Sequence, residues 1–298
     1  MAVKTVQAVI NGQTYNLTRN SGTGKYEATI TAPNKSSYGQ ANHYYDVTIK
    51  ATDDAGNVTT KNSSDATLGN SLKLYVKEKI APTQTITYPT ANALITNNKP
   101  EIKWQVRDDD SGVDPDSIKL TIDSNAAITT GITKTPVSGG YDCSYTPSTT
   151  LADGQHTIKV DASDHDGNAS IQTSVTFKID TVAPTLNVTN PTDNFITNQS
   201  QITVEGTTND ATSSPVTVTI NDEPVTVQSN GSFSKQISLS EGENTITVVA
   251  TDGAGKSTTV TRHVTLDTGG PVFKSVTITP NPVDGGQTFV IEVEVEDD

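Results

Sequence analysis

The stretch Lys159-Val-Asp-Ala-Ser-Asp-His-Asp-Gly-Asn-Ala-Ser170 joins an alternating apolar and polar run to a turn rich in carboxylates. Two other segments repeat the pattern and end in TDDAGNVTT and TDGAGKST. In each copy the alternating run ends at an Asp (Asp53, Asp164 or Asp252), and a Gly follows three positions later. A period of two is typical of strands that bury one face. Because Gly supplies a positive φ and Asp can cap backbone amides, we predict three β-hairpin tips rather than catalytic carboxylate pairs.

The composition extends this prediction to the whole chain. Hydrophobic residues make up 32% and aromatic residues 5% of 298 residues. Val and Ile recur at alternate positions, and Asn, Gly, Asp and Ser cluster between them, which is typical of many short strands joined by tight turns. We find no amphipathic helix pattern, so the predicted fold class is all-β.

A second repeat marks the domain boundaries. The stretches APTQTITYPTANALITNN (81–98) and APTLNVTNPTDNFITNQ (183–199) align, and GPVFKSVTITPNP (270–282) begins in the same way. In each case the preceding strand runs into the motif [DE]-x-x-x-P. Its Pro fixes φ, which indicates a short linker. The spacing of about 100 residues is that of a seven-stranded sandwich. We therefore predict domains over 1–80, 81–182 and 183–269, and the first two strands of a further domain over 270–298.

The two end segments are incomplete in complementary ways. Ile10-Asn-Gly-Gln13 aligns with Ile220-Asn-Asp-Glu223, so residues 1–80 are expected to lack the first two strands of a sandwich. Residues 270–298 contain two such strands, and their ending EVEDD matches QVRDD at 105–109. An incomplete sandwich exposes apolar core and an unpaired edge. One hypothesis is that 270–298 of one copy donates strands to 1–80 of another copy, giving a filament or ring. The alternatives are a segment cut from a longer array and frayed ends.

Charge and motif searches exclude several function classes. The net charge of -14 repels phosphate and anionic lipid, so we expect no nucleic-acid or membrane partner. No stretch approaches about 18 apolar residues, and the start at Met1 shows no signal-peptide pattern. The four His lack metal-ligand spacing and no Ser lies in GxSxG or SxxK, so we expect no enzyme. Trp104 and Cys143 alternate with other inward-facing positions and are predicted to be core residues.

Three features together resemble bacterial immunoglobulin-like repeats. They are A-[TS]-D-x-x-G-[NK], the linker [DE]-x-x-x-P and DDDSGVDPDSIKLTID at 108–123. Such repeats occur in adhesins, in accessory modules of secreted glycosidases and in phage tail proteins, and this chain looks most similar to those encoded among phage tail genes. The resemblance covers nearly the whole chain and implies tandem immunoglobulin-like β-sandwich domains in a linear array. It also implies a location on a phage virion or an extracellular surface.

In this fold the loop after the second strand, the last hairpin and the incoming linker share one end of a domain. Hard oxygen ligands gathered there suit Ca²⁺, which takes about 6–8 of them. The candidate calcium ligands at the first junction are Glu78, Asp108, Asp109, Asp110, Asp114, Asp116, Asp164 and Asp166. The corresponding set in the next domain is smaller: Asp180, Asp210 and Asp252. The alternative is that all of these are solvated turn residues with local capping.

The expected function is that of a non-enzymatic rod on a virion or cell surface. Its repeated loops would bind a host or bacterial surface polysaccharide or protein weakly and gain by avidity. One alternative is a structural spacer or head-to-tail filament subunit without a ligand. Another is an accessory module of a secreted polysaccharide hydrolase.

Overall fold

The computed structural model describes residues 2–297, which form strands, turns and three short 3-10 helices. The predicted all-β fold is confirmed. Met1 and Asp298, the outermost residues of the predicted end segments, lie outside the described residues. No helical segment within 2–297 has the length and apolar character needed to cross a membrane. The chain divides into two compact units: residues up to Ala93 with Asn97–Ile179, and Leu94–Thr96 with residues from Asp180 onward.

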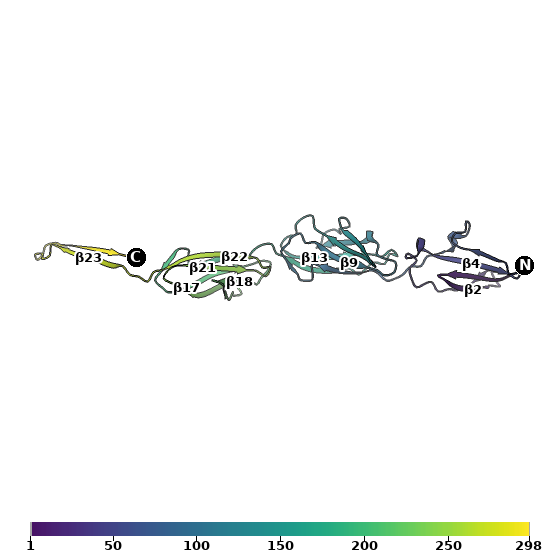
Figure 1. Ribbon diagram of the computed structural model, residues 1–298, viewed down its shortest axis with the longest axis horizontal. Helices are drawn as coiled ribbons and strands as arrows, with labels where there is room; N and C mark the ends of the chain where they lie inside the picture. The colour runs from purple at the N-terminus through teal and green to yellow at the C-terminus, as the bar shows by residue number, and fades with distance from the viewer. Residues whose placement is uncertain (1, 298) are drawn as a thin grey trace. The chain divides into compact units, whose positions relative to one another are not determined.

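The first strands of the chain build one antiparallel sheet, here called the N-terminal sheet (Figure 1). Its order is β3-β2-β1-β4-β5, with β6 beside β4. The strands are β1 (Val3–Ile10), β2 (Gln13–Arg19), β3 (Tyr26–Glu27), β4 (Tyr45–Asp53), β5 (Val58–Lys61) and β6 (Lys73–Leu74), with 3-10 helices η1 (Ala41–His43) and η2 (Gly69–Leu72). Ala8, Ile10 and Tyr45 are buried, whereas Val47 and Ile49 on the same sheet are only half-buried. All six strands belong to this single layer.

The next strands form a two-layer sandwich, here called the second sandwich. One sheet has the order β11-β12-β9-β7, and β10, β13 and β14 pair in that order in the facing sheet. Trp104 on β9 is 1% exposed, so its prediction as a core residue is confirmed. The elements are β7 (Thr83–Tyr88), β9 (Ile102–Arg107), η3 (Pro115–Ser117), β10 (Lys119–Ile122), β11 (Thr133–Val137), β12 (Gly140–Tyr145), β13 (Gly154–Asp161) and β14 (Thr173–Ile179).

The third sandwich repeats this plan in the second unit. Its sheets have the orders β15-β17-β20 and β16-β22-β21-β18-β19. The core residues come from alternate positions of strands in both sheets, as the period of two predicts: Val188, Ile202, Val204, Val218, Ile220, Phe233, Ile246, Val248, Ala250 and Val264. The strands are β15 (Thr185–Asn190), β16 (Phe195–Thr197), β17 (Gln201–Asn209), β18 (Thr217–Ile220), β19 (Glu223–Val225), β20 (Ser232–Ser238), β21 (Gly242–Thr251) and β22 (Ser257–Leu266), and β8 (Leu94–Ile95) also groups with this unit.

The last two strands form a hairpin, here called the C-terminal hairpin. It consists of β23 (Val272–Thr279) and β24 (Val290–Glu296), which pair antiparallel with each other (Figure 1). Every residue of both strands is exposed, including the apolar ones. A two-stranded hairpin of this kind has no buried core of its own.

Candidate metal centre

The three acidic hairpin tips have the geometry that the sequence predicts. Gly56, Gly167 and Gly255 have φ of 89°, 89° and 82°. The Asp that precedes each Gly accepts a hydrogen bond on Oδ1 from the backbone amide four positions later, at 2.8 Å in all three tips. These carboxylates therefore cap their turns, as Asp does in tight turns generally.

Each tip carboxylate has a second oxygen whose surroundings differ between copies. In the first two tips an Asn at the fourth position donates its side-chain amide to this oxygen: Asn57 to Asp53 at 2.9 Å and Asn168 to Asp164 at 2.6 Å. The hydrogen bonds from the Asn57 side chain and backbone lower the pKa of Asp53. The third tip has Lys256 at this position. Capping therefore occupies Oδ1 in all three tips, and the Asn side chain also occupies Oδ2 in the first two.

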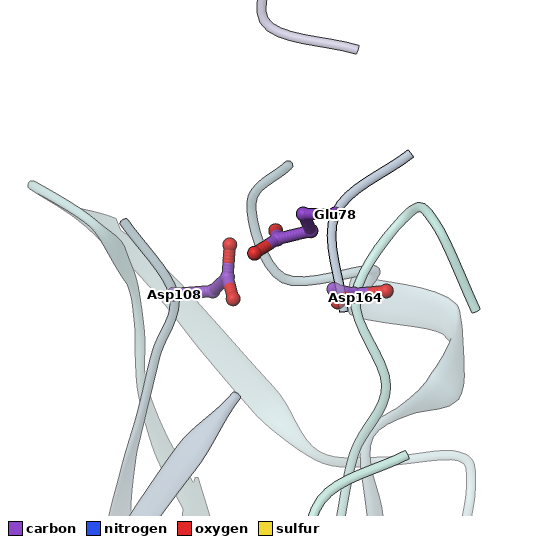
Figure 2. A group of neighbouring side chains, drawn as sticks. All are labelled: Glu78, Asp108 and Asp164. Atoms are coloured by element: carbon purple, nitrogen blue, oxygen red, sulfur yellow. The ribbon is translucent and has the colours of Figure 1, made fainter. Parts of the chain in front are cut away.

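Three carboxylates meet at the start of the second sandwich, and we call them the first cluster: Glu78, Asp108 and Asp164. One oxygen of each lies within 4.8 Å of the others (Figure 2). Glu78 comes from the linker before β7, Asp108 directly follows β9, and Asp164 is the hairpin tip. Figure 2 shows the carboxylate of Glu78 pointing toward that of Asp108.

Backbone amides hold the first cluster in place. Asp108 Oδ1 accepts from the amides of Asp110 at 3.1 Å and Gly112 at 2.7 Å. Glu78 Oε1 accepts from the amide of Ser111 at 2.7 Å, whereas Glu78 Oε2 is buried without a hydrogen-bond partner. The ion pairs found among residues 2–297 involve none of the three carboxylates.

The structure places the other five candidate ligands outside this cluster. Asp110 accepts from the amide of Ser36, and Asp114 accepts from the amide of Asp116 at the start of η3. Asp109 and Asp116 are exposed. Asp166 accepts from the amide of Glu78 at 2.9 Å, so it fastens the linker to the hairpin tip. The sequence showed that Asp166 is not required for the turn, and it gave no signal for this linker contact.

A second cluster lies at the start of the third sandwich and consists of Asp180, Asp210 and Asp252. One oxygen of each again lies within 4.8 Å of the others. The three residues are 0%, 8% and 6% exposed, so this cluster is more deeply buried than the first, although the sequence offered fewer acidic residues here. The origins correspond to those of the first cluster: a linker residue, the residue after the second strand and a hairpin tip.

Donors fill part of the coordination capacity of the second cluster. Asp210 Oδ1 accepts from the amides of Thr212 and Ser213, and the Ser213 hydroxyl donates to Asp180 Oδ2. Asp252 Oδ1 caps its turn, but Asp252 Oδ2 is buried without a hydrogen-bond partner. A buried carboxylate oxygen without a donor is energetically costly, and a bound cation would offset that cost.

Electrostatics favours a cation at both clusters. Two unit charges at the outer limit of 4.8 Å repel by about 3.5 kcal/mol at an effective dielectric constant of about 20. Each cluster contains three such groups, and a divalent ion would reverse the sign of this interaction. An all-oxygen donor set with carboxylates suits Ca²⁺ or Mg²⁺ rather than a metal that prefers nitrogen or sulfur.

The His and Cys side chains, which are residue types used in catalysis, are held by contacts with other residues or are buried. His156 is buried and contacts Asp123 at 2.9 Å and the carbonyl of Ala152 at 2.7 Å. His43 and His165 both stack on the ring of Tyr38. His263 contacts Asp193 at 3.2 Å. Cys143 is buried as predicted, and its burial raises the pKa of the thiol to about 11, so it is a poor nucleophile at neutral pH.

Comparisons with known proteins match the two sandwiches separately. Residues 83–181 match the family model of the bacterial Ig-like domain, and residues 184–268 match that of glucodextranase, domain B. Bacillopeptidase F of Bacillus subtilis (strain 168) is 32% identical over 126 residues, which cover 42% of this chain and 9% of that protein. This chain thus spans less than a tenth of the length of that curated relative.

Solved structures with similar folds include two multidomain proteins. The fibronectin(III)-like modules of Clostridium thermocellum CbhA match with a TM-score of 0.34 and 18% identity, covering 62% of this chain and 94% of that one. An I-band fragment of titin matches with a TM-score of 0.44 and 12% identity, covering 89% and 88%. Both TM-scores are below 0.5, so neither likeness bears on function.

Proposed function

We propose that this chain, which carries a bacterial Ig-like domain over residues 83–181, is a non-catalytic spacer module of an extracellular or surface protein, with linkers fixed by calcium. The observation that carries the calcium site is the unpartnered, buried Oδ2 of Asp252 beside two other buried carboxylates. In both clusters one ligand comes from the linker and two come from the domain that follows. A bound ion would therefore fasten each linker to that domain and restrict its motion.

Two comparisons support the accessory role. The third sandwich is similar to a domain of a glucodextranase, and the Bacillopeptidase F match covers a small part of a much longer protein. Both matches support a module within a larger protein. An accessory module of a secreted hydrolase and a module of a surface protein share this architecture. In both, the module can act as a spacer.

Adhesion to a surface polysaccharide or protein stays a prediction, as does a place on a phage virion. The chain's one tryptophan, Trp104, lies in the core and is not free to stack on a sugar. Binding would therefore depend on loops and on tyrosines such as Tyr75, which is 67% exposed. Binding of the purified chain to a glycan array or to whole cells tests adhesion independently of calcium.

Calorimetric titration tests the calcium sites directly. Ca²⁺ added to the EDTA-treated chain is expected to bind at two sites, with dissociation constants in the range of extracellular modules, roughly 0.1–1 mM. The double variant Asp108→Asn with Asp210→Asn is expected to lose both sites, because Asn keeps the capping oxygen but removes the charge.

The matched control is the double variant Asp109→Asn with Asp222→Asn. It removes the same charge from the same two sandwiches at positions outside the clusters. It is expected to bind calcium as the wild type does. Equal loss in both double variants would show a nonspecific charge effect, and no heat in the wild type would refute the calcium sites.

A further inference from the structure

A serine hydroxyl lies buried in the loop that follows β9. Ser111 is 4% exposed, and its Oγ has no hydrogen-bond partner among residues 2–297. A buried hydroxyl of this kind has given up its hydrogen bonds to water without gaining others, which lowers the free energy of unfolding. Packing alone therefore does not explain a serine at this position, because an alanine would fill it without that cost.

This hydroxyl is close to a carboxylate of the first cluster. The backbone amide of Ser111 donates to Glu78 Oε1 at 2.7 Å. The amide nitrogen and Oγ of a serine are joined through Cα and Cβ only, so the hydroxyl lies near the same carboxylate. The other oxygen of this carboxylate, Glu78 Oε2, is also buried without a partner. Two buried oxygens that lack partners therefore belong to one pair of contacting residues.

The loop that carries Ser111 is held by a second carboxylate of the cluster. Asp108 Oδ1 accepts from the amides of Asp110 at 3.1 Å and Gly112 at 2.7 Å, which flank Ser111 in the chain. Gly112 has a φ of 81°, a conformation that glycine adopts without strain. The loop thus ties the position of Ser111 to both Asp108 and Glu78.

The second cluster has a serine at the same place, but its hydroxyl is engaged. Asp108 and Asp210 directly follow the second strand of their sandwiches, and each begins an Asp-x-x-Ser sequence that ends at Ser111 or Ser213. The Ser213 hydroxyl donates to the linker carboxylate Asp180 at Oδ2. In the first cluster the linker carboxylate instead accepts from the serine amide. The same motif therefore leaves the hydroxyl free of protein partners in the first cluster only.

Given the calcium site of the proposed function, on which this inference rests, we propose that Ser111 Oγ is an uncharged fourth ligand of the ion at the first cluster. A hydroxyl oxygen is a hard donor, and Ca²⁺ takes about 6–8 oxygens that include neutral ones beside carboxylates. One cation bound there would engage both Ser111 Oγ and Glu78 Oε2. The two sites then differ in chemistry, because the hydroxyl of Ser213 is a hydrogen-bond donor to its cluster.

Ser111→Ala separates a ligand from a structural serine, because it removes an oxygen without changing any charge. In EDTA the variant is expected to have a melting temperature equal to or above that of the wild type, since the lost hydroxyl had no partner. Ser213→Ala is the contrasting variant and is expected to melt lower in EDTA, because Asp180 loses a donor. Differential scanning calorimetry of the full chain measures both changes.

Calorimetric titration measures calcium at the first site alone when the full chain carries Asp210→Asn, which removes a ligand of the second cluster. In this background Ser111→Ala is expected to bind Ca²⁺ about ten-fold more weakly, because the ion loses one oxygen. The matched control is Ser124→Ala, which removes the hydroxyl of an exposed serine after β10 in the same sandwich. It is expected to leave the affinity unchanged.

The outcomes distinguish the serine from the site. No heat in the Asp210→Asn chain would overturn both the first calcium site and the role of Ser111. Equal affinities of the Ser111→Ala and Ser124→Ala chains would keep the calcium site and overturn the serine ligand, leaving a buried water as the partner of the hydroxyl. A lower melting temperature of Ser111→Ala in EDTA together with weaker binding would show that the serine supports the loop and is not a ligand.

Discussion

Substitution of Asp252 by Asn is expected to change stability in opposite directions with and without calcium. The Asn side-chain oxygen can keep the two hydrogen bonds that Asp252 Oδ1 accepts from the amides of Ala254 and Lys256. Its amide nitrogen replaces the unpartnered Oδ2 of a carboxylate that clusters with those of Asp180 and Asp210. The substitution therefore removes a like charge and adds a donor, while the turn stays capped.

The magnitude without calcium follows from the geometry of the second cluster. At the outer limit of 4.8 Å a carboxylate pair repels by about 3.5 kcal/mol at an effective dielectric constant of about 20, and Asp252 takes part in two of the three pairs. Hydrogen bonds that Asp210 and Asp180 accept from Thr212 and Ser213 offset most of this repulsion. We therefore expect the Asn variant to gain about 1 kcal/mol in free energy of unfolding in EDTA.

With calcium the wild type should be the more stable protein. A site with a dissociation constant of roughly 0.1 mM gains about 2.3 kcal/mol at about 5 mM Ca²⁺. For a domain of this size that is a rise of roughly 10–18 °C in melting temperature. The Asn variant should lose most of this rise, because the ion then has two charged ligands in place of three.

Differential scanning calorimetry in calcium and in EDTA measures both effects on one chain. The control is Asp222→Asn, which removes a charge at the β18–β19 turn and keeps a residue that tolerates positive φ there. The expected result is a crossover for Asp252→Asn and none for Asp222→Asn. A loss of stability of equal size in calcium and in EDTA would show that calcium does not act through Asp252, and the reasoning would be refuted.

Two further substitutions test the first cluster and the packing of the third sandwich. Glu78→Gln should lower the calcium-induced rise in melting temperature of the second sandwich. The fluorescence of Trp104, the chain's one tryptophan, follows the unfolding of this sandwich. An unchanged rise would show that Glu78 is not a calcium ligand. Gly206→Ala should lower the free energy of unfolding of the third sandwich by roughly 1–3 kcal/mol, because an added Cβ would lie 2.4 Å from the carbonyl oxygen of Asn187 and 2.5 Å from the ring of Phe233. Unchanged stability of this sandwich in calorimetry would contradict the prediction.

The fold follows from local patterns in the sequence. Alternating positions such as Ile102, Trp104 and Val106 predict which face of a strand is buried, since a strand exposes and buries residues with a period of two. The tips at Asp53 and Asp164 are predicted because their turn chemistry depends on residues four positions apart. Both signals are contained within one element and need no knowledge of the neighbours.

The site could be predicted only in part because it depends on loops that meet in space. Three of the eight candidate ligands at the first junction come together, and nothing local distinguishes Asp108 from its neighbours Asp109 and Asp110. The first junction has more acidic residues than the second, but the second cluster is the more deeply buried. Counting acidic residues therefore did not predict burial. Asp180 is fully buried because it faces the loop that holds Asp210 and Ser213, and this packing has no counterpart in composition.

The sequence left turn capping and cation binding as alternative interpretations of the acidic residues, but the geometry is compatible with both at once. Capping uses Oδ1 of the tip Asp and leaves Oδ2, whose partner is set by the residue four positions later. Asn168 donates to that oxygen in the first cluster, whereas Asp252 Oδ2 lacks a partner where the chain has Lys256. The same turn therefore holds its carboxylate rigid in both sandwiches, and one position decides how much of that carboxylate remains for an ion.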